Sequence, residues 1–126
     1  MSTGVTLDAG PLIQVDRGDR RVVLLLARAT EVGARVVIPA PALAQAIRNP
    51  SRQARLARLL RQPLTDVVPL DRVEATQVGL LLAQSRTRDI ADAHVVVCAR
   101  RTGSRVVTSD PDDLRALDPD LDLEVI

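Results

Sequence analysis

The sequence predicts an α/β fold in which a parallel sheet carries helices on both faces. Short apolar runs alternate with segments whose apolar residues repeat at helical spacing, an order typical of parallel sheets. Of the 126 residues, 46% are hydrophobic and none is aromatic, so we expect a core of Leu, Val, Ile and Ala. The length predicts one domain, residues 1–126.

Five short apolar runs are the predicted strands. Proline, glycine and aspartate bound these runs, as they commonly bound strands. The runs lie at residues 5–8, 35–38 and 67–68, between Gly103 and Asp110, and at residues 121–126.

The helices of the first half follow from proline positions and helical spacing. Pro11 suits the first turn of a short helix. Asp19 can cap a helix over about residues 20–30, where apolar residues recur at helical spacing. Two prolines after the second strand open another short helix. Ser51 is the expected N-cap of a helix over about residues 52–61.

Aspartates mark the helices of the second half. Asp71 is the expected cap of a helix that extends to about Ser85. Asp89 reads as the N-cap of the next helix, which Gly103 ends. Asp110 can cap a short helix after the fourth strand.

Charge is distributed unevenly along a chain whose net charge is only +1. Residues 48–61 hold five arginines and no acid, and we call them the arginine strip. Residues 110–126 hold seven acids and one arginine. A basic strip beside an acidic site suggests a phosphate-bearing partner held near a metal. The alternative is that both segments are ordinary solvated faces.

The sequence favours a cytoplasmic protein. Cys98 is the only cysteine and lies in an apolar helical run, so we expect a small core residue and no disulfide within the chain. The first residues lack the basic region of a signal peptide. No apolar run approaches the length of about 18 residues that a membrane span needs.

Two aspartates are predicted to meet at one edge of the sheet. Asp8 ends the first strand and Asp110 follows the fourth, and sites in parallel sheets form at the carboxyl ends of strands. Asp92 begins the helix that leads into the fourth strand, so it joins them only if the preceding loop returns to that edge. Each acid alone could equally be a helix cap.

Clustered carboxylates point to a hard metal ion. Like charges raise one another's pKa values unless a cation offsets them. Oxygen ligands select Mg²⁺ or Mn²⁺, and such an ion can activate a water molecule for phosphodiester hydrolysis. The sequence offers no competing catalytic set, because His94 is the single histidine, Cys98 has no partner, and no glycine-rich phosphate loop is present.

Four short segments carry a family resemblance: residues 7–9, 38–48, 90–94 and 107–114. They resemble the PIN-domain family, in particular the VapC-like toxins of bacterial type II toxin–antitoxin pairs. The resemblance implies a PIN-like three-layer α/β/α sandwich with a central, mostly parallel five-stranded sheet. It also implies an endoribonuclease that depends on Mg²⁺ or Mn²⁺, a homodimer, and a cognate antitoxin protein as partner.

The resemblance also assigns roles to site residues. Asp8, Asp92 and Asp110 match the family's metal-binding, catalytic aspartates, so the resemblance places Asp92 in the site. Asp113 matches an accessory acid that is often a further metal ligand. Thr108 and Ser109 fall where a hydroxyl often lines the site and contacts RNA.

Gln45 departs from the family's pattern, because a glutamate is usual there. An amide oxygen can still bind a metal or hold a metal-bound water, but it brings no charge. The site therefore has one anionic ligand fewer, which predicts weaker metal binding. Neither Glu31 nor Glu74 obviously substitutes for the missing acid.

The sequence is compatible with three functions. In the first, the acids cleave RNA while Arg48, Arg52 and Arg55 bind its phosphates. In the second, the chain is a catalytically weakened or inactive PIN-like module that binds RNA or a protein, and Gln45 supports this. The third is a phospho-receiver domain, a family that relies on a lysine, and this chain has none.

Overall fold

The protein forms a five-stranded sheet with the strand order β3-β2-β1-β4-β5. The computed structural model describes residues 4–126, so the first three residues of the N-terminal stretch considered above lie outside it. All four neighbouring strand pairs are parallel, which confirms the predicted sheet. The strands are β1 (Val5–Leu7), β2 (Val36–Pro39), β3 (Thr65–Val68), β4 (Arg105–Thr108) and β5 (Leu123–Val125).

Helices fill the connections between the strands. Within the described residues these are α1 (Ala9–Asp16), α2 (Arg20–Glu31), α3 (Ala40–Ala46), the 3-10 turn η1 (Pro50–Arg52), α4 (Ala54–Leu60), α5 (Arg72–Ser85), α6 (Ile90–Thr102) and α7 (Pro111–Leu117). The expected caps Asp19, Asp71 and Asp89 each accept a hydrogen bond from the backbone N–H three residues later. Gly103 ends α6 in the left-handed conformation that favours glycine.

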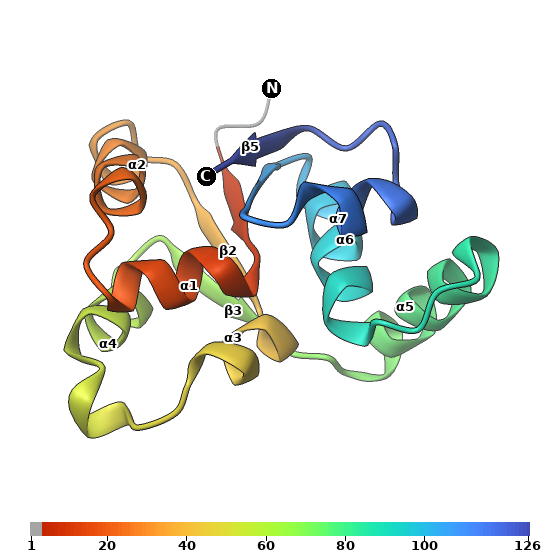
Figure 1. The fold of residues 1–126 in the computed structure, drawn as a ribbon, viewed down its shortest axis with the longest axis horizontal. Helices are drawn as coiled ribbons and strands as arrows, with labels where there is room; N and C mark the ends of the chain where they lie inside the picture. The colour runs from red at the N-terminus through yellow and green to blue at the C-terminus, as the bar shows by residue number, and fades with distance from the viewer. Residues whose placement is uncertain (1–3) are drawn as a thin grey trace.

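The helices lie in two layers with the sheet between them (Figure 1). Helix α1 contacts both α2 and α4 on one side, and α6 packs against β1, β2 and β4 on the other, where α5 and α7 cover it. The chain leaves β1 toward β2 and returns later to β4, so connections in the two directions cover opposite faces. The three-layer α/β/α sandwich is therefore confirmed.

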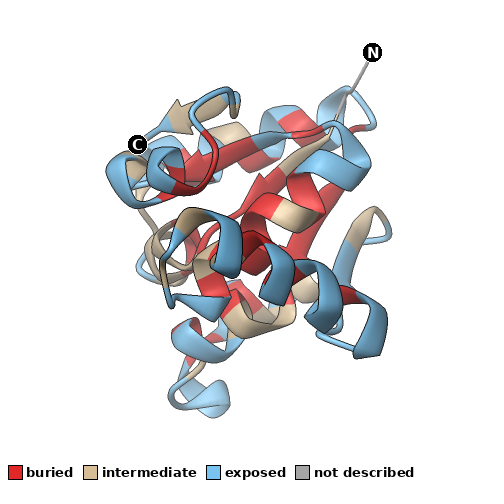
Figure 2. Cartoon of the chain, turned by 90° about the vertical axis from the view of Figure 1, so that its right-hand side faces the viewer, coloured by how far each residue is buried: buried red, intermediate tan, exposed pale blue. Residues whose placement is uncertain are grey.

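An aliphatic core fills the space between the sheet and its helices. Figure 2 shows the buried residues along the strands and on the inward sides of the helices. The largest fully buried apolar side chains come from β1, α1, β2, α4 and α7: Leu7, Leu12, Ile38, Leu56 and Leu114. The predicted core of branched aliphatic residues is confirmed.

The continuous helix predicted over residues 52–61 is wrong. The chain forms η1 first, and α4 begins only after Gln53. Ser51 caps neither element, because its hydroxyl donates to Asn49 Oδ1. The buried Gln53 side chain organises this connection, since it accepts from the backbone N–H of Arg48 and of Asn49 and donates to the Ala46 carbonyl oxygen.

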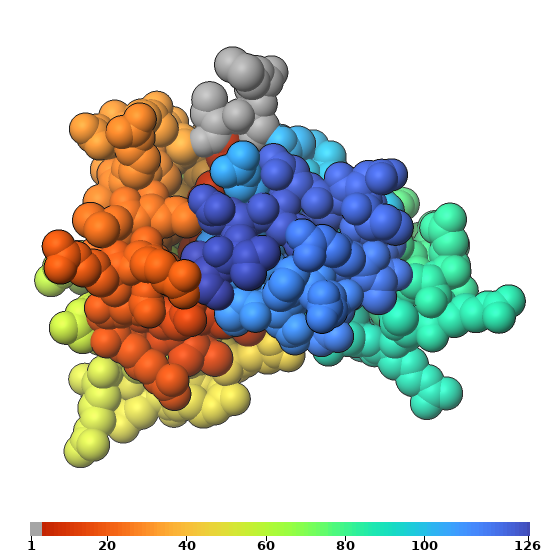
Figure 3. Space-filling view, turned by 45° about the horizontal axis from the view of Figure 1, so that its top comes forward, coloured from red at the N-terminus to blue at the C-terminus, as the bar shows by residue number. Residues whose placement is uncertain are grey.

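The C-terminal segment lies on the same face as the N-terminal helices. In Figure 3 the blue segment occupies the middle of this face, between the orange helices and α5.

None of the helices in residues 4–126 combines the length and apolar character that a membrane span needs.

Candidate functional site

Asp8 stands where β1 ends and α1 begins. Its backbone N–H donates to the Val107 carbonyl oxygen, at 3.1 Å, which continues the pairing of β1 with β4. Its side chain is only 6% exposed. One carboxylate oxygen accepts from the Ala9 N–H and the other from the Thr108 hydroxyl, both at 2.8 Å. The Asp8 carboxylate is therefore held at the carboxyl edge of the sheet.

Thr108 joins Asp8 to the segment that carries Asp110. The Thr108 hydroxyl donates to Asp8 and accepts from the Asp110 backbone N–H, at 2.9 Å. The Thr108 side chain is fully buried, and its expected contact with RNA stays a prediction. Ser109 is exposed, and Gly10 approaches it so closely that a Cβ at Gly10 would overlap its hydroxyl.

Asp110 and Asp113 lie together at the start of α7. Asp110 is exposed and occupies the N-cap position of α7, but its side chain forms no capping hydrogen bond, so its expected capping role is wrong. The neighbouring carboxyl of Asp113, close enough to share a hydrogen bond, raises the pKa of Asp110, and the charges of Asp113 and Asp8 add to the effect. This pair lies next to Asp8 in space.

Asp92 lies at the same edge of the sheet. Helix α6 begins there and runs back toward the start of β4, so its first turn faces the carboxyl ends of the strands. Burial raises the pKa of Asp92 to about 7, and the charges of Asp89, Asp8, Asp113 and Asp110 add to this effect. The structure therefore places Asp92 at the edge of the sheet where Asp8 and Asp110 lie, a placement that the sequence alone left open.

Asp89 lies near these aspartates as well, although from the sequence it was predicted only to cap a helix. It does cap α6, since its Oδ1 accepts from the Asp92 N–H at 2.9 Å. Its charge also raises the pKa of Asp8, after burial, and that of Asp92. We call Asp8, Asp89, Asp92, Asp110 and Asp113 the acidic cluster.

The acidic cluster fits a hard divalent cation by its chemistry. Its donor atoms are all carboxylate oxygens, and burial together with mutual repulsion raises the pKa of Asp8 and of Asp92. In residues 4–126, however, no three of these carboxylates bring their oxygens within 4.8 Å of one another. Ion binding would therefore require the side chains to turn inward.

Gln45 adds no charge to this arrangement. It lies exposed on α3, a helix that contacts both α1 and α6. Within the described part of the chain its side chain forms no hydrogen bond. Glu31 is exposed at the end of α2, and Glu74 is buried between α5 and α6, so neither replaces the missing acid.

A second polar group lies buried between α5 and α6. Glu74 meets His94, Cys98 and Arg101, and we call these four residues the polar link. His94 Nε2 lies 3.2 Å from Glu74 Oε1, and Cys98 Sγ lies 3.8 Å from the same oxygen. The three residues of α6 recur at the spacing of one helix face, a signal that the sequence contained and that sequence reasoning missed.

The polar link includes a possible metal-binding group of a different kind. Glu74, His94 and Cys98 are the one set of three within the described residues whose ligand atoms all lie within 4.8 Å. Imidazole and thiolate ligands favour a softer ion such as Zn²⁺. Arg101 already pairs with the second oxygen of Glu74, and burial raises the pKa of Cys98 to about 12. An ion would have to compete with both the guanidinium and the thiol proton.

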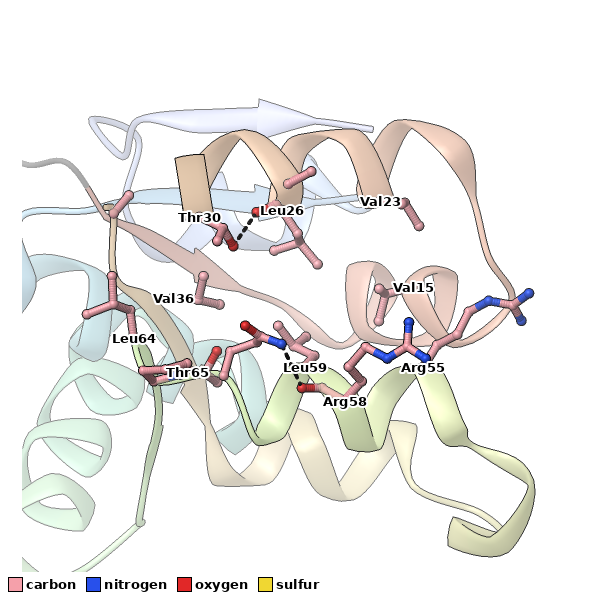
Figure 4. A pocket seen from close by; sticks show the side chains of 14 residues that line it. Val15, Val23, Leu26, Thr30, Val36, Arg55, Arg58, Leu59, Leu64 and Thr65 are labelled. Carbon is pink, nitrogen blue, oxygen red and sulfur yellow. Dashed lines mark hydrogen bonds between the residues drawn. The ribbon is translucent and has the colours of Figure 1, made fainter. Parts of the chain in front are cut away.

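The arginine strip borders an apolar groove of about 620 Å³ between α2 and α4 (Figure 4). Arg55 and Arg58 lie on its rim, and Val15, Leu26 and Leu59 are among the side chains that line it. No residue of the acidic cluster lines this groove. Arg48 donates to the carbonyl oxygens of Ala44 and Ile47 at the end of α3.

The chain is similar in sequence to one protein family and in structure to several solved proteins. The sequence model of the PIN domain family matches residues 5–118. No curated protein sequence matches the chain significantly. Among solved structures, a FitAB complex bound to an IR36 DNA fragment is 18% identical, with a TM-score of 0.66, covering 96% of this chain and 94% of that one.

Two further structures are similar. VapBC2 from Rickettsia felis, bound to a DNA fragment from its promoter, is 15% identical with a TM-score of 0.67, covering 97% of this chain and 98% of that one. FitAcB from Neisseria gonorrhoeae is 20% identical with a TM-score of 0.65, covering 94% of this chain and 95% of that one.

Proposed function

Since this chain belongs to the PIN domain family, we propose that it is a metal-dependent endoribonuclease of the VapC type. The observation that supports this most strongly is the acidic cluster at the carboxyl edge of the sheet. Burial and the charges of four neighbouring acids raise the pKa of Asp92, and a divalent cation would relieve this repulsion. We expect Mg²⁺ or Mn²⁺ to be that cation.

The residues of the cluster have different proposed tasks. Asp8, Asp92 and Asp110 hold the cation, and Asp113 assists beside Asp110. A divalent cation held there would supply a water molecule of lowered pKa as the nucleophile for the phosphodiester bond. The hydrogen bonds from Ala9 and Thr108 fix Asp8, so this ligand is oriented before the ion arrives. Gln45 is proposed to hold water rather than the ion.

Arginines are the proposed contacts to the RNA backbone. Arg48, Arg52 and Arg55 are exposed and carry permanent charge. Ser109, exposed beside the acidic cluster, is the proposed hydroxyl contact. Because the chain has no aromatic residue, stacking of a base would have to use a guanidinium plane.

We further propose a cognate antitoxin as partner, a homodimer as the assembly and the cytoplasm as the location. The similar structures are complexes named FitAB and VapBC2, which supports a partner of that kind. The apolar groove between α2 and α4, with Arg55 and Arg58 on its rim, suits an acidic segment that presents an apolar face.

Cleavage of RNA by the purified protein tests the nuclease proposal. We expect degradation in Mn²⁺, loss of degradation in a chelator, and loss in Asp8→Asn. Degradation that is equal in the wild type and in Asp8→Asn would show a contaminating nuclease. A wild-type protein that cleaves no RNA would contradict the proposal.

A non-catalytic module that binds RNA or a protein is the second candidate, and Gln45 is the observation that favours it. The substitution Gln45→Glu separates the two. A strong gain in activity would identify a disabled nuclease, because the added carboxylate restores the missing charge. Unchanged activity in a protein that already cleaves RNA would show that Gln45 suits the native mechanism.

A further inference from the structure

We propose that the polar link is a Zn²⁺ site, in which Glu74, His94 and Cys98 are the ligands. The site is separate from the acidic cluster, and it does not depend on the proposed nuclease activity. It lies between α5 and α6, on the face of the sheet that α6 covers. The ion would join these two helices, and α6 carries Asp92 in its first turn.

The three ligand atoms lie at nearly the spacing that a tetrahedral zinc site requires. His94 and Cys98 are one turn apart on the same face of α6, and Glu74 meets them from α5. His94 Nε2 lies 3.2 Å from Glu74 Oε1, and Cys98 Sγ lies 3.8 Å from the same oxygen. Usual Zn²⁺ bond lengths place such a nitrogen and oxygen about 3.4 Å apart, and such a sulfur and oxygen about 3.6 Å apart. The ion therefore requires only small movements of these side chains.

Hydrogen bonds alone leave this buried group incompletely satisfied. His94 is fully buried, and within the described residues its Nδ1 has no hydrogen-bond partner. The Cys98 sulfur has two long contacts, at 3.8 Å to Glu74 and at 3.9 Å to Arg101. Buried polar atoms that serve only the fold normally find partners at shorter range. Imidazole, thiol and carboxylate together are a donor set that Zn²⁺ uses in proteins.

Arg101 leaves the ligand oxygen of Glu74 accessible to an ion. It pairs with Oε2, whereas His94 and Cys98 both meet Oε1. Glu74 can therefore bind an ion through Oε1 and keep Arg101 on Oε2, as metal ligands commonly keep an outer partner. The guanidinium also lies 3.9 Å from Cys98 Sγ, where it would stabilise the thiolate. Its charge repels a cation as well, so binding is weaker than at a site without an arginine.

A groove of about 480 Å³ between α5 and α6 gives access to the site. Glu74, Gln77 and Arg101 are among the residues that line it. His94 and Cys98 are fully buried and do not line the groove. The ion can enter from this side with a water molecule as its fourth ligand. Binding releases the Cys98 proton to solvent, and the thiolate and the Glu74 carboxylate then balance the two charges of the ion.

Titration of the reduced protein with Co²⁺, a spectroscopic substitute for Zn²⁺, tests the site. A thiolate bound to Co²⁺ absorbs in the near ultraviolet, and Cys98 is the only cysteine of the chain. The chain has no aromatic residue that would obscure this region. We expect one equivalent of Co²⁺ to produce the thiolate band and Zn²⁺ to remove it. Cys98→Ser should lack the band.

His94→Gln is a second variant, which keeps the thiol and removes the imidazole. We expect it to weaken Zn²⁺ binding, measured by competition with Co²⁺, by at least about tenfold. Zn²⁺ should also raise the melting temperature of the wild type more than that of His94→Gln or Cys98→Ser. Asp8→Asn is the control, because it changes the acidic cluster and should retain the thiolate band. Thermal unfolding without metal confirms that each variant is folded.

The wild type alone can contradict the inference, since a protein that gives no thiolate band with Co²⁺ does not have this site. Equal Zn²⁺ affinities of the wild type and a folded His94→Gln would also overturn it, because the ion would then lie elsewhere. A band that is lost in folded Asp8→Asn would show that the two sites are not separate. These results do not depend on RNA cleavage in Mn²⁺, so the inference and the proposed function can fail independently.

Discussion

Thr108 is the residue on which the orientation of Asp8 depends. Its buried hydroxyl donates to the Asp8 carboxylate and accepts from the backbone of Asp110, so one side chain joins the ends of β1 and β4. Burial raises the pKa of Asp8, and this hydrogen bond partly opposes the effect. The proposed metal site would therefore depend on a residue whose own side chain is fully buried.

Thr108→Val tests this dependence, because valine has nearly the same shape and no hydroxyl. We expect the pKa of Asp8 to rise further and Mn²⁺ binding at neutral pH to weaken. The free energy of unfolding should fall by about 1–3 kcal/mol, the usual range for a buried group that loses its partner. Thr108→Ser is the control and should retain binding. Wild-type affinity in the valine variant would contradict the orienting role.

The raised pKa of Asp92 predicts that the stability of the metal-free protein depends on pH. Its pKa is about 7 in the folded chain and ordinarily 3.8, so between these values the folded state holds a proton that the unfolded state has lost. This contribution to stability is therefore lost as the pH rises through that window, and it stays lost above about 7. Asp8, whose pKa is also raised, acts in the same direction.

The melting temperature in a chelator, measured at pH 5 and pH 8, checks this expectation. Asp92→Asn should be more stable relative to the wild type at pH 8 than at pH 5, because only the wild type carries the ionised carboxylate. A difference between the two proteins that is the same at both pH values would show that Asp92 has an ordinary pKa.

The limits of sequence reasoning are clear for single residues. Asp8 could be placed from the sequence, because a residue that follows a parallel strand must lie at the carboxyl edge. Asp89 satisfied the requirements of a cap, and nothing in the pattern showed that its charge would also act on Asp8. That proximity depends on how α6 packs across the sheet, which local sequence does not encode.

At the scale of elements, Glu74 links α5 to α6. Burial raises the pKa of Glu74, but hydrogen bonds from Arg101 and His94 outweigh this effect, so its pKa is lowered. The carboxylate therefore stays ionised while it joins three residues of one face of α6. Because α6 carries Asp89 and Asp92 at its start, this link also contributes to the position of the acidic cluster.

Glu74→Ala should destabilise the protein by about 1–3 kcal/mol, since His94 and Arg101 lose their partner. Glu124→Ala is a matched control, because Glu124 pairs with Arg105 at 3.8 Å where both side chains are about half exposed. That variant should cost less than about 1 kcal/mol. Urea unfolding measures both, and equal losses would show that the polar link contributes no more than a surface pair.

Helix boundaries show what element patterns can and cannot predict. Apolar spacing located α2, because this helix buries one regular face. The same spacing over residues 52–61 concealed the break at Gln53. A polar side chain that satisfies the backbone of its own loop leaves no periodic signal, so this break could only be seen in the structure.

At the scale of the whole molecule, the site follows from the strand order. The chain leaves β1 toward β2 in one direction, and β4 pairs with β1 on the other side. Connections in opposite directions open a crevice between β1 and β4, where sites in such sheets are found. The start of α6 reaches this edge as well, because a helix that precedes a parallel strand must begin at the carboxyl edge and end at the other. Applied to the sequence, this reasoning would have placed Asp92 without the family resemblance.

A crystal structure of the protein soaked in Mn²⁺, with the ion located by its anomalous scattering, tests the central claim most directly. The account predicts an ion held by Asp8, Asp92 and Asp110, with Asp113 beside Asp110. An acidic cluster without an ion, or an ion found only at Glu74, His94 and Cys98, would contradict it.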